Sequence, residues 1–307
     1  MIYNRKGDIT VKTKKCVVFL VSIIFSIMFF YNISFAEFSD IKNNKYRLSI
    51  TKMQELEILN GIEKDKFLPD SKVTREQFAT IIIRTLDFQD NINNQKSVFP
   101  DVDTKRWSAG YINEAYTRNL ITGKSDGLFY PEENITFGQV CTILVKTLGY
   151  NDLDGVWPSN YVNKANDLDI TKDLKINSFD DVRRDELAQI INNFLNTKMK
   201  DSNMTVAEMY GIYIEDIVIG NSITIDSLKE NQIVTVNHGI LDNDSGKNNL
   251  NLGEKYDFVL ENGVIVKIIS LDNKVEKFNV INYKDGKISD KNGEILLSAK
   301  YTYYNNG

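Results

Sequence analysis

Two arginines and two tryptophans are the residues of this chain best suited to recognising a ligand. Arg75 and Arg184 each lie in the first turn of an expected helix. A cation there opposes the helix dipole, so it does not serve helix stability. Beside free backbone N–H groups, an arginine suits an anion such as a carboxylate or a phosphate. The alternative is a solvated arginine, or one paired with a nearby acid.

Trp107 and Trp157 are the two tryptophans of the chain, and they occupy one position of a sequence repeat. Aromatic faces stack on sugar rings, which favours a carbohydrate site. The alternative is a core aromatic residue that opens a helix.

The composition argues against metal and catalytic chemistry. The 307 residues include two cysteines and a single histidine, His238, and one histidine cannot build a multi-ligand metal site. The stretch DNDSG at 242–246 is rich in acids but lacks the bidentate glutamate of a calcium loop, so a solvated loop is favoured. We therefore predict no catalytic residue, no metal site and no cofactor.

Residues 1–36 have the layout of a secretory signal peptide. Basic residues precede an almost wholly apolar run at 16–31, and a small-residue site ends at Ala36. The alternative to cleavage is an uncleaved anchor, for which the run is near the short limit. The leader holds five of 37 basic and one of 42 acidic residues, which leaves 32 and 41, a net charge of −9. We thus expect no nucleic-acid partner and no stable membrane insertion after cleavage.

Residues 61–88 align without a gap on residues 123–150. A weaker third copy follows, in which Trp157 aligns on Trp107. Each copy is expected to form a helix, a loop and a second helix, and Cys141 is expected in the core of one such helix.

The second helix of each copy has a start signal. Thr136 and Gln139 form a capping box, and Thr74 and Gln77 repeat it. The third copy has Arg183 at the cap position, and Asp180 or Asp181 is the alternative candidate for the cap.

Together these features resemble the S-layer homology (SLH) domain over about residues 37–198. The resemblance rests on Phe38-Ser39-Asp40 and Phe99-Pro100-Asp101, the aromatic position, the Gly turn, the Phe-x-Pro loop and the helix start. It divides the chain into repeats at 37–98, 99–150 and 151–200. It implies a mainly α-helical pseudo-trimer around a three-helix bundle. It also implies non-covalent attachment to the Gram-positive cell wall, through grooves that bind a secondary cell-wall polysaccharide, commonly one with a pyruvate ketal.

The family's binding residues carry over by position. They fall on the motif arginines Arg75 and Arg184, the aromatics Trp107 and Trp157, and the motif threonines Thr74 and Thr136. The second repeat has Phe137-Gly138 in place of Arg-Ala, and the third offers only residues 176–179 in place of the Gly-x-Phe-x-Pro loop. We therefore expect one or two competent grooves rather than three.

Residues 201–307 are rich in β-branched residues and predict a small antiparallel all-β domain, either a barrel or a sandwich. Asn262-Gly263 is a strong hairpin signal, and Asp285-Gly286 and Asn292-Gly293 offer further turns. The closing YTYYNNG leads to the hypothesis that the last sheet is incomplete.

The leading prediction is a secreted, non-enzymatic protein anchored at the cell wall or cell surface, as part of an S-layer. One alternative is a wall-attached hydrolase with the β domain catalytic, for which Glu215, Asp216 and Glu261 are available but no spacing singles out a pair. Another is an adhesin or assembly module that binds a surface-protein partner through the β domain.

Overall fold

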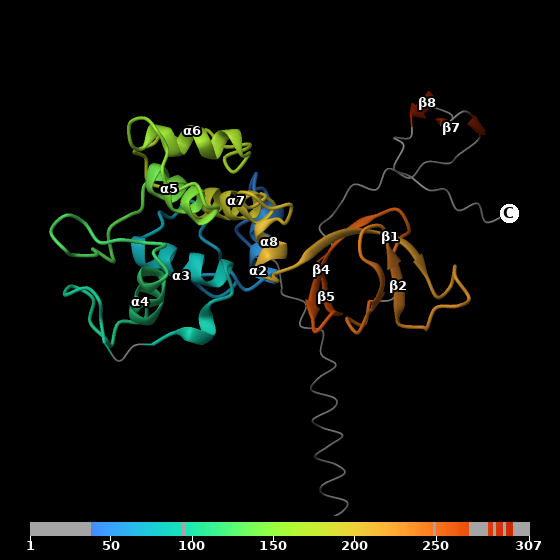
Figure 1. Ribbon diagram of the computed structural model, residues 1–307, viewed down its shortest axis with the longest axis horizontal. Coiled ribbons are helices and arrows are strands. Elements are labelled where there is room, and N and C mark those ends of the chain that lie inside the picture. Colours follow the sequence, from blue (N-terminus) through green and yellow to red (C-terminus); the bar gives the residue numbers. More distant parts are fainter. Residues whose placement is uncertain are drawn as a thin grey trace, which may run out of the picture. The chain divides into compact units, whose positions relative to one another are not determined.

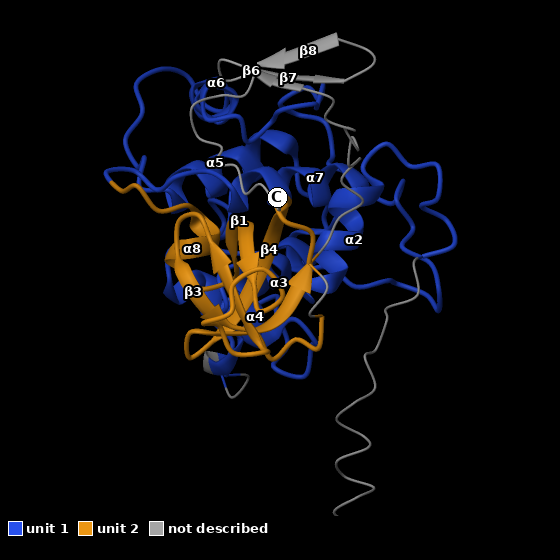
Figure 2. Ribbon diagram, turned by 90° about the vertical axis from the view of Figure 1, so that its right-hand side faces the viewer, with its two compact units in different colours: residues 1–201 blue, residues 202–307 orange. Residues whose placement is uncertain are grey.

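A computed structural model of the protein describes residues 38–93, 96–247, 250–269, 282–284, 287–290 and 293–296. The predicted signal peptide and the closing YTYYNNG lie outside the described residues. The chain divides into two compact units, residues 1–201 and residues 202–307, called unit 1 and unit 2 (Figure 2).

Unit 1 is helical, and its helices pack in pairs that join neighbouring predicted repeats (Figure 1). The helices are α2 (Arg47–Glu55), α3 (Arg75–Thr85), the 3-10 turn η1 (Gln89–Asn91), α4 (Ala109–Thr117), α5 (Phe137–Thr147), α6 (Ser159–Asp167) and α7 (Arg184–Leu195). Helix α3 packs on α4, α5 on α6, and α7 on α2. The second helix of each predicted repeat therefore packs on the first helix of the next, and the last repeat returns to the first.

Two of the three long second helices begin with the predicted capping box. Thr74 and Thr136 accept hydrogen bonds from the amides of Gln77 and Gln139, whose side chains accept from the cap amides in return. The expected aspartate cap of α7 is wrong. The carboxylate of Asp181 accepts instead from Asn134, in the neighbouring repeat.

The loops before α3, α5 and α7 meet in a closed ring of three backbone hydrogen bonds. The amide of Val73 donates to Val182 at 3.0 Å, Val182 donates to Ile135 at 3.2 Å, and Ile135 donates to Val73 at 2.9 Å. All three side chains are buried. The ring fixes the starts of the three helices relative to one another.

The aspartate of each Phe-x-Asp stretch binds a loop within its own repeat. The carboxylate of Asp101 accepts from the amides of Phe129 and Tyr130 at 2.9 and 2.6 Å. Tyr130 has a positive φ of 60°, an uncommon conformation for a side chain of this size. The aspartate thus stabilises a strained loop, and Asp40 does the same for the corresponding loop of the first repeat. Cys141 is buried, as predicted.

Unit 2 contains the predicted antiparallel β domain. Its elements are the short helix α8 (Val206–Met209) and the strands β1 (Ile214–Asn221), β2 (Gln232–Thr235), β3 (Gly239–Asp242), β4 (Lys255–Glu261) and β5 (Val264–Ile269), in the sheet order β3-β2-β1-β4-β5. An isolated bridge links the two edges of the sheet: the amide of Asp244, just after β3, donates to the carbonyl of Ile265 on β5 at 2.8 Å. Its core includes Val218, Phe258 and Ile268.

The predicted hairpin at Asn262-Gly263 is confirmed. Both residues have positive φ, 51° and 82°, and the flanking Glu261 and Val264 are paired. A second sheet of β6 (Asn282–Lys284), β7 (Lys287–Asp290) and β8 (Gly293–Leu296) is also antiparallel. Asp285-Gly286 and Asn292 lie outside the described residues.

Candidate functional site

Each long second helix begins against a loop of the following predicted repeat. We call these contacts the first interface (α3 with loop 129–134), the second interface (α5 with loop 176–181) and the third interface (α7 with loop 67–72).

The first-turn amides at these interfaces are not free, contrary to the premise of the sequence argument. At the first interface the amides of Arg75 and Glu76 donate to loop carbonyls at 2.8 and 3.1 Å. The corresponding pairs, Phe137-Gly138 and Arg184-Asp185, do the same at 2.7–2.9 and 2.9–3.1 Å. Any anion bound here must therefore be recognised by side chains rather than by the helix N-terminus.

Arg75 binds the loop of the next repeat with its guanidinium group. Its Nε donates to the carbonyl of Phe129 at 2.7 Å and its Nη2 to the carbonyl of Thr122 at 3.1 Å. The guanidinium also stacks on the Phe129 ring, 4.6 Å from the ring centre. Arg75 thus stabilises the loop, which is a structural role that the sequence did not reveal.

Arg184 makes the same contacts at the third interface. It donates to the carbonyls of Phe67 and Asn60 at 2.9 and 2.7 Å, and it stacks on the Phe67 ring. Burial lowers the pKa of Arg184 to about 10, while Asp40 opposes the shift. Burial also lowers the pKa of Arg75. With a pKa of about 10, Arg184 stays charged at neutral pH. The hydrogen bonds described for the two guanidinium groups go to backbone carbonyls and not to carboxylates.

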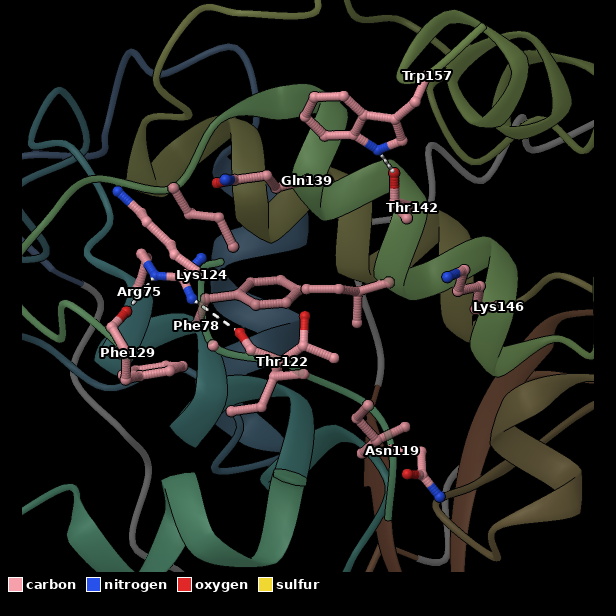
Figure 3. A pocket seen from close by; sticks show the side chains of 15 residues that line it. Arg75, Phe78, Asn119, Thr122, Lys124, Phe129, Gln139, Thr142, Lys146 and Trp157 are labelled. Carbon is pink, nitrogen blue, oxygen red and sulfur yellow. Dashed lines mark hydrogen bonds between the residues drawn. The ribbon is translucent and has the colours of Figure 1, made fainter. Parts of the chain in front are cut away.

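A pocket of about 320 Å³ opens beside the first interface, and all three predicted repeats contribute to it (Figure 3). Arg75 comes from the first repeat, Phe129 and Lys146 from the second, and Trp157 from the third. In the view of Figure 3, Arg75 and Phe129 lie on one side of the pocket, Lys146 on the other and Trp157 above. The structure thus brings together one predicted arginine and one predicted tryptophan.

The charged side chains described in the pocket lining are all basic: Arg75, Lys124 and Lys146. Lys124 forms an ion pair with Glu133, so its charge is partly neutralised. The pocket suits a ligand that combines an anionic group with a surface able to stack on an aromatic ring.

Trp157 is half exposed and its indole N–H donates to the hydroxyl of Thr142 at 3.1 Å. Trp107 is also exposed and does not line this pocket. The side chains of Thr74 and Thr136 cap α3 and α5. The structure therefore separates the six predicted residues into two in the pocket, one at the third interface, two caps and one exposed tryptophan.

Sequence reasoning missed Lys146 and the pair Glu76–Arg106. Lys146 aligns with the basic Arg84 of the first repeat, which was the available signal. The buried Glu76 carboxylate accepts from Arg106 at 2.6 and 2.9 Å and from the hydroxyl of Ser108 at 2.5 Å. It thereby joins α3 to the segment that leads into α4.

Two of the acids proposed for a hydrolase, Asp216 and Glu215, have partners within the described part of unit 2. Asp216 is 1% exposed and accepts from the amides of Asn237 and His238 and from the ring of His238 at 2.7 Å. Burial opposes ionisation of Asp216, but these hydrogen bonds lower its pKa overall. Glu215 pairs with Lys255 at 2.7 Å. These contacts give Asp216 a structural role between β1 and the turn at 237–238.

Among the described residues, no cluster of three or more histidine, cysteine or acidic side chains could hold a metal ion. Within the same residues, none of the helices is both long and apolar enough to span a membrane.

The family model of the S-layer homology domain matches residues 37–79 and 98–141. Two S-layer homology repeats are therefore present, and the third predicted repeat lies outside the matches.

Similar proteins include surface proteins and an enzyme. A cell surface protein of Thermoanaerobacter kivui is 32% identical over 182 residues, which cover 58% of this chain and 24% of the relative. A middle cell wall protein of Brevibacillus brevis is 26% identical over 129 residues, 41% of this chain and 12% of the relative. An endoglucanase of Bacillus sp. strain KSM-635 is 32% identical over 114 residues, which cover 37% of this chain and 12% of the relative.

The chain spans a quarter or less of the length of these curated relatives. The domain matches, together with the surface-protein relatives, confirm the predicted location at the cell wall or cell surface.

Proposed function

We propose that unit 1 anchors the protein non-covalently to a Gram-positive cell wall by binding a secondary cell-wall polysaccharide. The observation that carries the proposal is the pocket in which Arg75, Lys146 and Trp157 converge. A sugar with an acidic substituent, such as a pyruvate ketal, would place its carboxylate against the cations and its ring against the indole. The proposed role is binding rather than catalysis.

The proposal extends to the architecture of unit 1. Residues 151–200 would be a third repeat, and the three repeats would form a pseudo-trimer around a bundle of α3, α5 and α7. The closed ring of backbone bonds and the cyclic pairing of the helices support this arrangement. Arg184 and Trp107 would belong to a second groove, while Thr74 and Thr136 would act only by fixing the helix starts.

The decisive experiment is co-sedimentation of the full chain with cell-wall sacculi of Thermoanaerobacter kivui. Intact sacculi should retain the protein, whereas sacculi stripped of polysaccharide by hydrofluoric acid should not. Equal retention by both would contradict the proposal.

Variants then test the pocket. Lys146→Ala and Trp157→Ala should each weaken retention, because Lys146 and Trp157 are exposed side chains that line the pocket. Lys64→Ala is the matched control, since Lys64 is exposed and does not line it. Retention that is unchanged in both pocket variants would show that the polysaccharide binds elsewhere.

A second function, contact with a surface-protein partner, is favoured by exposed apolar side chains of unit 2. Ile223, Val236 and Ile240 are each exposed. If they form a contact, Ile240→Asp should abolish co-purification with surface-layer proteins and leave binding to sacculi intact; unchanged co-purification would argue against it.

A further inference from the structure

Phe179 is a large apolar side chain that the fold of unit 1 leaves exposed. The third repeat has Ile176 at the position of the buried motif phenylalanines Phe67 and Phe129, and Phe179, three residues further on, is 71% exposed. The third repeat therefore presents a ring to solvent at a position where the other two repeats have the acids Asp70 and Glu132. Burial in the core of unit 1 does not explain this phenylalanine.

Phe179 extends the aromatic surface of the pocket. Its ring stands edge to face with Trp157, with ring centres 6.4 Å apart and planes inclined by 73°. Trp157 is 49% exposed and lines the first pocket. The two rings thus form a continuous exposed apolar surface that begins in the pocket and leads out of it.

Phe179 also lines a second, more open pocket of about 400 Å³ at the third interface. Its charged lining is balanced, with the basic Lys72, Lys175 and Arg183 and the acidic Asp180, Asp181 and Glu186. Such a lining offers both donors and acceptors, as sugar hydroxyl groups require. The described charged residues of the first pocket are all basic, so the first pocket favours an anionic group, whereas the second pocket favours a neutral one.

We propose that Phe179 and the second pocket form a subsite for a neutral, hydroxyl-rich sugar residue of the same polysaccharide whose acidic residue occupies the first pocket. The inference rests on the proposed function and deepens it, because it makes the ligand a chain of at least two sugar residues with one charge placed at the first pocket. Trp157 stacks between the two subsites and Phe179 carries the chain to the second.

The test compares fragment lengths on the full chain. Polysaccharide released from Thermoanaerobacter kivui walls is separated into single repeat units and longer fragments, and the affinity of each is measured by calorimetry. The wild type should bind the longer fragments more tightly. Phe179→Ala should lose roughly tenfold in affinity for the longer fragments, about 1.4 kcal/mol, and keep its affinity for the single unit. Phe179→Tyr should behave as the wild type.

Controls distinguish a failure of the second subsite from a failure of the proposed wall-anchoring function. Ile62→Ala removes another exposed apolar side chain, one that lines neither of the two pockets, and should change nothing. Removing the acidic substituent from the fragments should weaken the wild type and Phe179→Ala equally. If the wild type binds no fragment, the wall-anchoring function itself fails. If the wild type binds and Phe179→Ala matches it on both lengths, the second subsite is wrong and the first pocket stands.

Discussion

At the first and second interfaces, the first residue of the helix contacts the corresponding loop of the following repeat, but the side chains in contact differ. At the first, Arg75 donates to two loop carbonyls and stacks on Phe129. At the second, the equivalent residue is the buried Phe137, and Gly138 lies so close to Pro158 that an added Cβ would stand 2.7 Å from it. One interface is polar and the other apolar.

The third interface shows that the residue at the start of the helix goes together with the sequence of the facing loop. Arg184 faces a loop with Phe67 and Pro69, just as Arg75 faces one with Phe129 and Pro131. Where the facing loop lacks this motif, the arginine is absent as well. The two departures seen in the sequence, Phe137 in the second repeat and the missing loop in the third, therefore lie against each other at one interface.

The largest effect is expected from removing the apolar contact. Phe137→Ala should destabilise unit 1 by about 4 kcal/mol, because a fully buried ring is replaced by a cavity. Both tryptophans lie in unit 1, so urea unfolding followed by tryptophan fluorescence reports on this unit alone. Phe179→Ala is the control and should leave the midpoint unchanged, since its ring is exposed. If Phe137→Ala lowers the free energy of unfolding no more than the control does, the apolar contact of Phe137 does not stabilise the second interface.

Removing the arginine should cost somewhat less. Arg75→Ala leaves the carbonyls of Phe129 and Thr122 without their donor, for which we expect about 3 kcal/mol. Arg75→Lys should recover only part of this, since an ammonium group cannot match the planar fork. The same fluorescence measurement applies. Full recovery with lysine would mean that charge, rather than hydrogen-bond geometry, holds the loop.

Local spacing made the helix starts, the capping boxes and the Asn262-Gly263 hairpin predictable, because each depends on residues within four positions. The partners of the arginines were not predictable in this way. Arg184 donates to Phe67, which is 117 positions away, and no local pattern records that contact. The same limit explains why the first-turn amides were expected to be free: their acceptors lie on the next repeat.

The pocket was predictable in part. The repeat aligned Trp157 and Arg75 with their counterparts, and the family resemblance named them as binding residues. It could not say that they would converge across three repeats, or that Trp107 would lie outside this pocket. Which copy supplies which side chain depends on the cyclic packing of the helices, which the sequence of any one repeat does not contain.

A smaller effect is expected from crowding the second interface. Gly138→Val should cost about 2 kcal/mol, because its Cβ would meet Pro158 at 2.7 Å and the carbonyl of Ser178 at 2.9 Å. Gly138→Ala places the same Cβ with fewer atoms beyond it and should cost less. The graded loss is read from the unfolding midpoint of unit 1. A valine variant as stable as the wild type would show that loop 176–181 can move away from α5.

The smallest effect concerns a feature that the two interfaces share. Thr74→Ala and Thr136→Ala each remove one cap hydroxyl and should each cost about 1 kcal/mol, with serine restoring most of it. Because both helices have the same capping box, the two losses should be equal, unlike those of Phe137 and Arg75. Unequal losses would mean that the cap depends on the neighbouring loop. Equal losses would mean that the caps contribute the same stability at both interfaces. The difference between the interfaces would then come from the two residues after each cap, Arg75-Glu76 and Phe137-Gly138, which contact the facing loop.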